Sequence, residues 1–391
     1  MDHFDTVFSS IERPFAWLDF DALDQNIDFV NKASGQKQIR IATKSIRSVE
    51  VLKYIKQHLE RCSGFMTFTA RETLYLLEKG FNHLLIGYPV YEEQAISEIA
   101  SFVKAGKDIT FMIDHIEQAF LLQKIAEISG IHFQICIDLN MSSDYHVLYF
   151  GTKRSPISTI EKLQSFLEQL RPLTNLRIHA AMGYDAQIAG VADVSAEFFG
   201  LKGKLIRLLK RHSKKGVTRF RQDGVKVISK NHQLAFVNAG GSGSMKYCCT
   251  QDDVTEITVG SAFFAPALFD GYDDLKLAPA AGFALRITRE FSDHIFVCHG
   301  GGYIASGAIG KDRLPAFLEP QYYSFTPLEG AGEVQTPIVV KNRSQRIGDT
   351  IYFRHAKAGE LCERFNELHT TRSGTYTGSI RTYRGDGQCF L

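Results

Sequence analysis

Short apolar runs alternate with longer amphipathic stretches between about residues 38 and 238. The apolar runs have the length of buried strands, and the stretches between them repeat apolar residues at helical spacing. Strands that alternate with helices are typical of a parallel sheet flanked by helices. The predicted strands are Gln38–Thr43, Gly64–Thr67, His83–Gly87, Asp108–Ile113, Ile131–Asp138, Leu176–Ala181 and Leu234–Asn238. The predicted helices are Val49–Leu59, Ala70–Lys79, Tyr91–Ala105, Ile116–Ile128, Ser158–Leu170 and Ala196–Arg211.

The number and spacing of these units favour a closed α/β barrel. Seven or eight strand–helix units fit a (β/α)₈ TIM barrel, which takes about 250 residues. An open, doubly wound sheet is the alternative. We therefore assign residues 21–270 to a barrel.

The pattern changes beyond about Asp270. Helical stretches nearly vanish, short alternating runs such as Phe283–Thr288 and Gln335–Val340 appear, and Gly and Pro cluster between them. This is typical of an all-β domain. Pro14–Phe20 is a lone strand candidate before the first helix, and we expect it to pair with that domain. Residues 1–20 and 271–391 would then form one β domain.

Composition excludes several classes of protein. The 391 residues are 44% hydrophobic and 23% charged, as in globular proteins. The longest charge-free apolar stretch, Ile257–Phe269, is shorter than the roughly 20 residues needed to span a membrane. The acidic first residues lack the basic region of a signal peptide. The seven scattered cysteines suggest neither a disulfide framework nor a zinc finger. We expect a cytoplasmic protein without a membrane partner.

The charge balance argues against a nucleic-acid partner. Lys and Arg number 45 and Asp and Glu 43, a net charge of +2. One segment departs from this balance, since Lys202–Lys230 holds 11 Lys and Arg and the single acid Asp223. A solvated helix and loop outside the barrel is the favoured interpretation. A polyanion-binding surface is the alternative.

Lys44 is the first candidate catalytic residue. In a parallel barrel, catalytic groups lie at the C-terminal ends of the strands. The first predicted barrel strand runs directly into Lys44. A partly desolvated lysine at that place can act as a nucleophile or form an imine. A solvated surface lysine is the alternative interpretation.

A glycine- and serine-rich loop follows the last predicted strand. Ala239 is followed by Gly240-Gly241-Ser242-Gly243-Ser244. Small residues let backbone N–H groups approach an anion, and late barrel loops commonly bind phosphate. A flexible turn is the alternative. Together with Lys44, the loop predicts a phosphorylated carbonyl compound bound to a lysine. Pyridoxal 5′-phosphate fits this description, and so does a sugar phosphate in a class I aldolase.

Other strand ends and the β domain supply further candidates. Arg154, Tyr184 and Gln187 follow predicted strands and are suited to contact a ring, a phosphate or a carboxylate, or serve as structural loop residues. The stretch from His355 to Glu363 gathers His, Lys, acid and thiol. Its spacing matches no standard metal site, so we favour His355 as an acid or base.

Several motifs resemble fold-type III pyridoxal-phosphate enzymes, in particular their D-threonine aldolase and D-serine dehydratase branch. The motifs that carry the resemblance are PFAWLDFDALDQN (Pro14–Asn26), RIATKS (Arg40–Ser45) and NAGGSGS (Asn238–Ser244). Further stretches resemble the deaminase- and aldolase-like subgroup: GYDAQIAG (Gly183–Gly190), LFDGY (Leu268–Tyr272), GGGYIASG (Gly300–Gly307), GAGEVQTP (Gly330–Pro337), RHAKAGELCERF (Arg354–Phe365) and TYRGDG (Thr382–Gly387). The resemblance covers nearly the whole chain.

The resemblance implies an alanine-racemase-like barrel that carries pyridoxal 5′-phosphate and a C-terminal β domain that closes the site. It implies an aldimine on Lys44, Gly241, Ser242, Gly243 and Ser244 around the phosphate, and a homodimer. In this branch, a His followed two positions later by Asp or Cys binds a divalent metal. His355 matches the His, but Lys357 stands at the second position. A protonated ammonium cannot ligate a metal, so our hypothesis is that Lys357 replaces it.

The sequence therefore predicts a lyase of D-amino acid metabolism that acts on a D-β-hydroxy amino acid. It would catalyse either retro-aldol cleavage, as in D-threonine aldolase, or deamination, as in D-serine dehydratase. An amino acid racemase is the alternative, with Tyr303 or Tyr272 as the second base. A non-catalytic, cofactor-binding regulatory protein is the alternative from another class.

Overall fold

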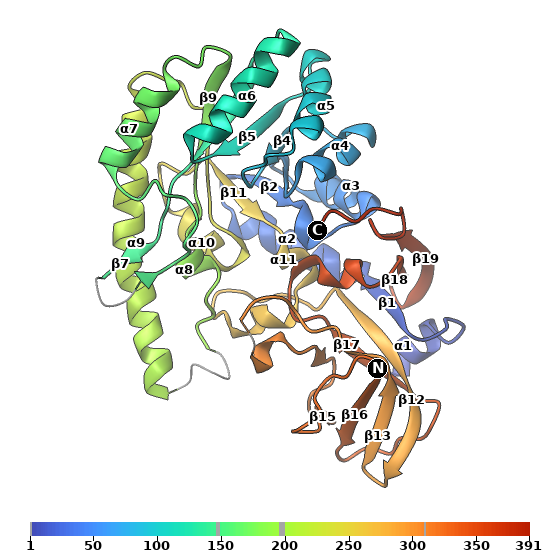
Figure 1. Cartoon of the computed structure of the whole chain (residues 1–391). Helices are drawn as coiled ribbons and strands as arrows, with labels where there is room; N and C mark the ends of the chain where they lie inside the picture. Colours follow the sequence, from blue (N-terminus) through green and yellow to red (C-terminus); the bar gives the residue numbers. More distant parts are fainter. Residues whose placement is uncertain (1, 146–148, 195–199, 309) are drawn as a thin grey trace.

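The computed structural model describes residues 2–145, 149–194, 200–308 and 310–391, and it contains a barrel and a separate β sheet (Figure 1). Eight parallel strands close the barrel, so the predicted (β/α)₈ architecture is confirmed and the open sheet is wrong. In order around the barrel the strands are β10 (Phe236–Ala239), β11 (Glu256–Val259), β2 (Gln38–Ala42), β3 (Cys62–Thr67), β4 (Leu84–Ile86), β5 (Ile109–Ile113), β6 (Phe133–Asp138) and β9 (Leu176–Gly183).

Side chains along each barrel strand point alternately into the barrel and outward to the helices. Met66, Leu85, Met112, Cys136 and their neighbours form a small cluster of their own inside the barrel, whereas the intervening residues pack against the helices. Side chains of neighbouring strand positions point to opposite faces of a sheet. The interior also holds a buried ion pair, in which Arg40 Nε lies 2.6 Å from Glu256 Oε1.

The strand β11 was missed in the sequence. Its last three residues belong to the apolar stretch Ile257–Phe269, and the charge of Glu256 interrupts the hydrophobic pattern. The structure explains this charge, because Glu256 points into the barrel and pairs with Arg40. The position of β11 also bears on the candidate active site. Strand β11 lies between β10 and β2, so the loops that follow those two strands flank the end of a single strand.

Helices cover the outside of the barrel (Figure 1). The prediction for Ala196–Arg211 is wrong in extent, since α9 runs continuously over Gly200–Ser229; residues 196–199 lie outside the described part. Gly216 and Gly224 lie inside this helix, although glycine disfavours a helix interior. The helices are α1 (Asp2–Val7), α2 (Phe20–Ala33), α3 (Val49–His58), α4 (Ala70–Glu78), α5 (Glu93–Lys104), α6 (Ile116–Ser129), α7 (Ile160–Leu170), α8 (Ala186–Ala189), α9, α10 (Met245–Cys249) and α11 (Ser261–Phe264).

The basic segment Lys202–Lys230 therefore lies on one helix as far as Ser229, and the loop expected within it is reduced to Lys230. Two of its cations are buried in ion pairs, Lys210 with Asp193 at 2.5 Å and Arg221 with Asp253 at 2.6 Å. Within the described part of the chain, no helix is long and apolar enough to cross a membrane.

The second part is a nine-stranded, mostly antiparallel sheet. Strand β1 lies between β12 and β18, as expected for Pro14–Phe20. The division of the chain at residues 20 and 270 stays a prediction. The strands of the sheet are β1 (Phe15–Asp19), β12 (Ala281–Ser292), β13 (Ile295–His299), β14 (Ala316–Phe317), β15 (Tyr323–Phe325), β16 (Gln335–Val340), β17 (Thr350–Arg354), β18 (Glu367–Arg372) and β19 (Thr375–Arg381). A separate two-stranded sheet pairs β7 (Ser143–Asp144) with β8 (Tyr149–Phe150).

Candidate active site

Lys44 lies in a 3₁₀ turn, η1 (Thr43–Ser45), directly after β2. Its Nζ donates a hydrogen bond of 2.5 Å to the hydroxyl of Tyr88, which follows β4. Because β3 lies between β2 and β4, this bond spans one strand end at the mouth of the barrel. Tyr88 was missed in the sequence. Its position two residues after a strand was the available signal, since strand ends carry the functional groups of a barrel.

The β domain covers the backbone of Lys44. Gly359 lies in the turn η5 (Ala358–Glu363), and a β carbon at this residue would lie only 2.1 Å from the carbonyl oxygen of Lys44. The same carbonyl accepts a hydrogen bond of 2.9 Å from Arg47 Nε. The β domain therefore packs directly on the turn that carries the lysine.

The glycine–serine loop begins where β10 ends. Gly240 has φ +74°, a left-handed conformation that glycine adopts without strain. The turn η2 (Ser242–Ser244) follows, and the hydroxyl of Ser242 accepts a hydrogen bond of 3.0 Å from the Ala262 N–H.

Residues after β11 connect this loop to the lysine turn. Ala262 contacts Ser242 on one side, and on the other a β carbon on Gly260 would lie 2.6 Å from Ser45 Oγ. Adjacent strands lie about 4.8 Å apart, so the ends of β2 and β10 are roughly 10 Å apart. The structure thus brings Lys44 and the glycine–serine loop to the same side of the barrel mouth.

Tyr184 and Asp185 lie beside the loop, after β9. A β carbon on Gly241 would lie 3.5 Å from the ring of Tyr184, so no side chain separates this ring from the loop. Asp185 is fully buried and accepts a hydrogen bond of 3.1 Å from Ser244 Oγ. Burial raises the pKa of Asp185 to about 7, although the charge of Arg221 lowers it. Its negative charge is thus partly removed at neutral pH, which suits an anion nearby.

Two further ionisable groups belong to the part of the mouth where β6 ends, beside β9. Asp138 ends β6, and burial raises its pKa to about 7, with a further increase from Asp114 and a decrease from Arg154. Burial, together with Asp185 and Tyr88, raises the pKa of Tyr184, and Arg154 lowers it in part. Arg154 itself is exposed. It therefore lies within electrostatic range of both Asp138 and Tyr184, although it belongs to a separate loop.

His355 and Lys357 follow β17 of the β domain. His355 is buried, and its ring lies edge-on to that of Phe264 at 6.3 Å between centroids. Lys357 is partly exposed, and its Nζ donates to the carbonyl oxygen and the hydroxyl of Ser306 at 3.1 and 3.3 Å. Burial lowers the pKa of Lys357 and Glu360 raises it, while the cations Arg313, Lys44 and Arg154 lower it. Lys357 thus lies within electrostatic range of Lys44.

The donor set around His355 does not fit the divalent metal that the resemblance implies. Among the described residues, no group of three or more His, Cys, Asp or Glu side chains could hold a metal ion. At the second ligand position stands Lys357, whose ammonium donates hydrogen bonds and has no lone pair to offer.

Three other predicted residues lie in different surroundings. Gln187 is 1% exposed and donates a hydrogen bond of 2.6 Å to the Met141 carbonyl. Tyr272 donates to the Ala189 carbonyl at 2.8 Å and packs against Gly243 of the loop. Tyr303 packs edge-on against Phe283 and lines a pocket of about 650 Å³ beside β1 and β18.

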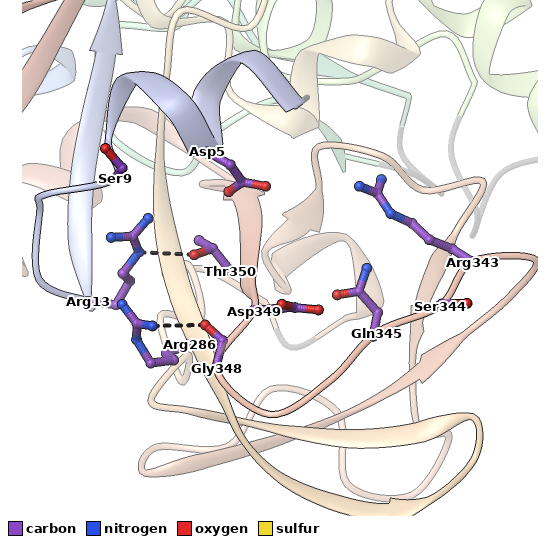
Figure 2. Close-up of a pocket in the computed structure, with 10 residues that line it drawn as sticks. All are labelled: Asp5, Ser9, Arg13, Arg286, Arg343, Ser344, Gln345, Gly348, Asp349 and Thr350. Carbon is purple, nitrogen blue, oxygen red and sulfur yellow. Dashed lines mark hydrogen bonds between the residues drawn. The ribbon is translucent and has the colours of Figure 1, made fainter.

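Figure 2 shows a further pocket, of about 410 Å³, in the β domain. Arg13 Nε donates to Thr350 Oγ1 at 3.0 Å and Arg286 Nη1 to the Gly348 carbonyl at 2.8 Å at its edge. None of the residues predicted for the site lines this pocket.

Pyridoxal 5′-phosphate fits the barrel mouth on three observations. Lys44 Nζ reaches Tyr88 across the end of β3, a loop without bulky side chains follows β10 two strands away from β2, and burial raises the pKa of Asp185 beside that loop to about 7. Lys44 would hold the carbonyl carbon, and the loop Gly241–Ser244 would hold the phosphate through N–H and hydroxyl groups.

Comparison with known families identifies the class. Residues 18–257, more than half of the chain, match the family described as "Alanine racemase, N-terminal domain", and the chain belongs to this family. The resemblance to fold-type III pyridoxal-phosphate enzymes is thereby confirmed. No curated protein sequence matches the chain.

Solved structures share the fold over nearly the whole chain. D-threonine aldolase from Filomicrobium marinum superposes with a TM-score of 0.80 at 14% identity, covering 96% of both chains. D-threo-3-hydroxyaspartate dehydratase from Delftia sp. HT23 gives 0.73 at 14% identity, covering 96% of this chain and 98% of that one. An alanine racemase from Clostridium difficile 630 gives 0.64 at 15%, covering 95% and 99%. All three are enzymes, and at these identities the likeness concerns the fold.

Proposed function

We propose that this protein is a pyridoxal-phosphate-dependent lyase that acts on a D-β-hydroxy amino acid. The observation that carries the proposal is the position of Lys44 and the glycine–serine loop on either side of the end of β11. The same fold occurs in a D-threonine aldolase and a D-threo-3-hydroxyaspartate dehydratase. The proposal includes a homodimer in the cytoplasm, which rests on the resemblance and on composition.

The residues of the barrel would bind and orient the cofactor. Lys44 Nζ would bond to its carbonyl carbon, and Gly241, Ser242, Gly243 and Ser244 would hold its phosphate. Tyr184 would lie beside the cofactor ring, because its own ring borders Gly241. When bound, the cofactor supplies an electron sink for the carbanion that develops at Cα.

The β domain would supply the proton transfer. His355 follows β17 and is buried, which suits an imidazole that takes the proton of the substrate β-hydroxyl in aldol cleavage. The ammonium of Lys357 would orient that hydroxyl where relatives use a metal, and Arg154 would pair with the substrate carboxylate. In the dehydratase variant, Lys44 Nζ would instead take the proton from Cα, and the β-hydroxyl would leave from Cβ as hydroxide.

The racemase alternative has less support. A racemase requires a second acid–base group on the face of the substrate opposite the lysine. Tyr272 already donates its hydroxyl to the Ala189 carbonyl, and Tyr303 lines a pocket that contains none of the barrel-mouth residues. Both candidates for the second base therefore lack a position that supports the role.

Product analysis tests the proposal. We would incubate the purified, cofactor-loaded protein separately with D-threonine, D-serine, D-alanine and L-alanine. Glycine plus an aldehyde from D-threonine identifies an aldolase, and a 2-oxo acid from D-serine identifies a dehydratase. Loss of optical rotation alone would make the protein a racemase. If no amino acid changes the visible spectrum of the cofactor, the non-catalytic alternative holds.

A further inference from the structure

We propose that Arg47 is a positioning residue for Lys44 and that the end of β19 together with the segment after it, residues 381–390, holds Arg47 in place. The inference rests on the proposed function, because it concerns the lysine that would bind the cofactor. Arg47 follows the turn η1, and in this proposal it acts on Lys44 and not on the substrate. It would act through the backbone and the carbonyl group of Lys44.

Arg47 has an unfavourable backbone conformation immediately after the lysine turn. Its φ is +51°, in the left-handed region that residues other than glycine, Asn and Asp seldom occupy. The N–H groups of Ile46 and Arg47 both donate to the Thr43 carbonyl, at 2.9 and 3.0 Å, and so close the turn around Lys44. Strained residues of this kind persist only where the surrounding structure fixes them.

The side chain of Arg47 links the turn to the β domain. Its Nε donates to the Lys44 carbonyl at 2.9 Å, and its Nη1 forms an ion pair with Glu363 of η5. The guanidinium lies 5.1 Å from the centre of the Phe68 ring, and only 8% of the side chain is exposed. One buried cation therefore fixes the orientation of the peptide group of Lys44 relative to the β domain.

The backbone on both sides of this link is held by residues far away in the sequence. The Tyr383 N–H donates to the Arg47 carbonyl at 2.8 Å, and Ser48 Oγ donates to the Arg381 carbonyl at 2.7 Å. These two bonds hold the strained residue Arg47 and the following Ser48 against the end of β19 and the segment after it. In Figure 1 this segment ends beside the barrel, next to the elements that follow β2.

A buried network anchors the segment itself. The Tyr383 hydroxyl donates to Glu72 Oε1 at 3.0 Å, and the other oxygen of Glu72 accepts from the Phe68 N–H at 2.8 Å. Glu72 and Tyr383 are both fully or almost fully buried. Tyr75 donates to Asp386 at 2.5 Å. These bonds fix the segment to α4. The segment in turn holds Arg47, which contacts the carbonyl oxygen of Lys44.

The test replaces Arg47 by Gln, which removes the charge and keeps most of the length. If Arg47 positions Lys44, Arg47→Gln lowers kcat by about tenfold to 100-fold, the cost of a misplacement of about 1 Å, with little change in KM. It also shifts the pH at which the visible absorbance of the bound cofactor titrates, which a purely structural role would not do. Arg61→Gln, a partly exposed arginine paired with its neighbour Glu60, is the matched control.

A second variant keeps the test decisive if Arg47→Gln does not fold. Glu363→Gln removes the partner of Arg47 without touching the strained backbone, and we expect a smaller change in the same two quantities. Wild-type kcat and an unshifted absorbance titration in either folded variant would overturn the inference. A wild-type protein that binds no pyridoxal phosphate would instead overturn the proposed function, so the two failures are distinguishable.

Discussion

Gly359 of the β domain lies directly against the carbonyl oxygen of Lys44, so that a β carbon on Gly359 would lie 2.1 Å from that oxygen. The same β carbon would lie 2.9 Å from Arg47 Nε. Two parts of the chain that are far apart in the sequence therefore meet at the backbone of the candidate catalytic lysine. No residue other than glycine fits at this contact without a shift of the backbone.

Gly359→Ala tests this contact. Insertion of a methyl group into a packed interface costs about 1–3 kcal/mol of the free energy of unfolding. We expect this loss together with weaker binding of pyridoxal phosphate, measured by denaturation and by equilibrium titration. Gly216→Ala is the control, because a β carbon there has open space inside α9. It should raise stability by about 0.5–1 kcal/mol, since alanine favours a helix interior. Equal cofactor affinity in Gly359→Ala and wild type would contradict the contact.

Tyr88→Phe removes the hydroxyl that accepts from Lys44 Nζ and keeps the ring. A hydrogen bond to a charged group contributes about 1.5–3 kcal/mol, so kcat should fall about tenfold or more. The control is Tyr91→Phe, whose side chain lies nearby in the sequence and is mostly exposed. Identical steady-state rates for Tyr88→Phe and Tyr91→Phe would show that the bond has no role in the reaction.

Gly243→Ala should weaken the binding of the cofactor phosphate. A β carbon at this position would lie 2.4 Å from both the Ala189 carbonyl oxygen and a ring carbon of Tyr272, so the loop must move. We expect the dissociation constant of pyridoxal phosphate to rise about tenfold or more, because the N–H groups of the loop lose their alignment. Titration with pyridoxal, which lacks the phosphate, is the control. An equal loss of affinity for both compounds would mean that the loop does not bind the phosphate.

Asp185 should make stability depend on pH. Burial raises its pKa to about 7, above the value of about 3.9 in unfolded chains. The folded protein therefore retains a proton that the unfolded chain releases between these two values, and this contribution to the free energy of unfolding falls as the pH rises from about 4 to about 7.

Asp185→Asn isolates that contribution, because the amide oxygen can still accept from Ser244. The free energy of unfolding of the variant, taken relative to that of wild type, should increase as the pH rises from about 5 to about 8. Denaturation of both proteins after removal of cofactor measures this, with the exposed acid Asp28→Asn as control. If Asp185→Asn and wild type differ in free energy of unfolding by the same amount at about pH 5 and at about pH 8, the raised pKa of Asp185 is contradicted.

The sequence was sufficient for the barrel because seven of its strands are short apolar runs between amphipathic helices. It failed at β11, where Glu256 enters the barrel interior to pair with Arg40. No local pattern distinguishes such a charge from one at the surface, because its partner lies on another strand. The predicted helix Ala196–Arg211 also ends too early, since α9 continues to Ser229 through Gly216 and Gly224, a residue type that disfavours a helix interior.

The candidate site was predictable only in part. Lys44 and the glycine–serine loop directly follow strands, and in a parallel barrel the residues that follow strands lie at the mouth, where the functional groups gather. The contacts of Tyr88, Arg47 and Gly359 with Lys44 depend on how the loops and the β domain pack. Such contacts join distant parts of the chain and leave no spacing in the sequence.

The most direct test of the central claim is to identify the residue that binds the cofactor. The purified protein is incubated with pyridoxal phosphate and reduced with borohydride, and the modified peptide is mapped by mass spectrometry. Lys44→Ala and Lys357→Ala serve as paired variants, since both lysines lie near the barrel mouth. We predict one adduct per chain on the peptide that contains Lys44, retained in Lys357→Ala and lost in Lys44→Ala. An adduct on another lysine, or none in the wild-type protein, would contradict the account.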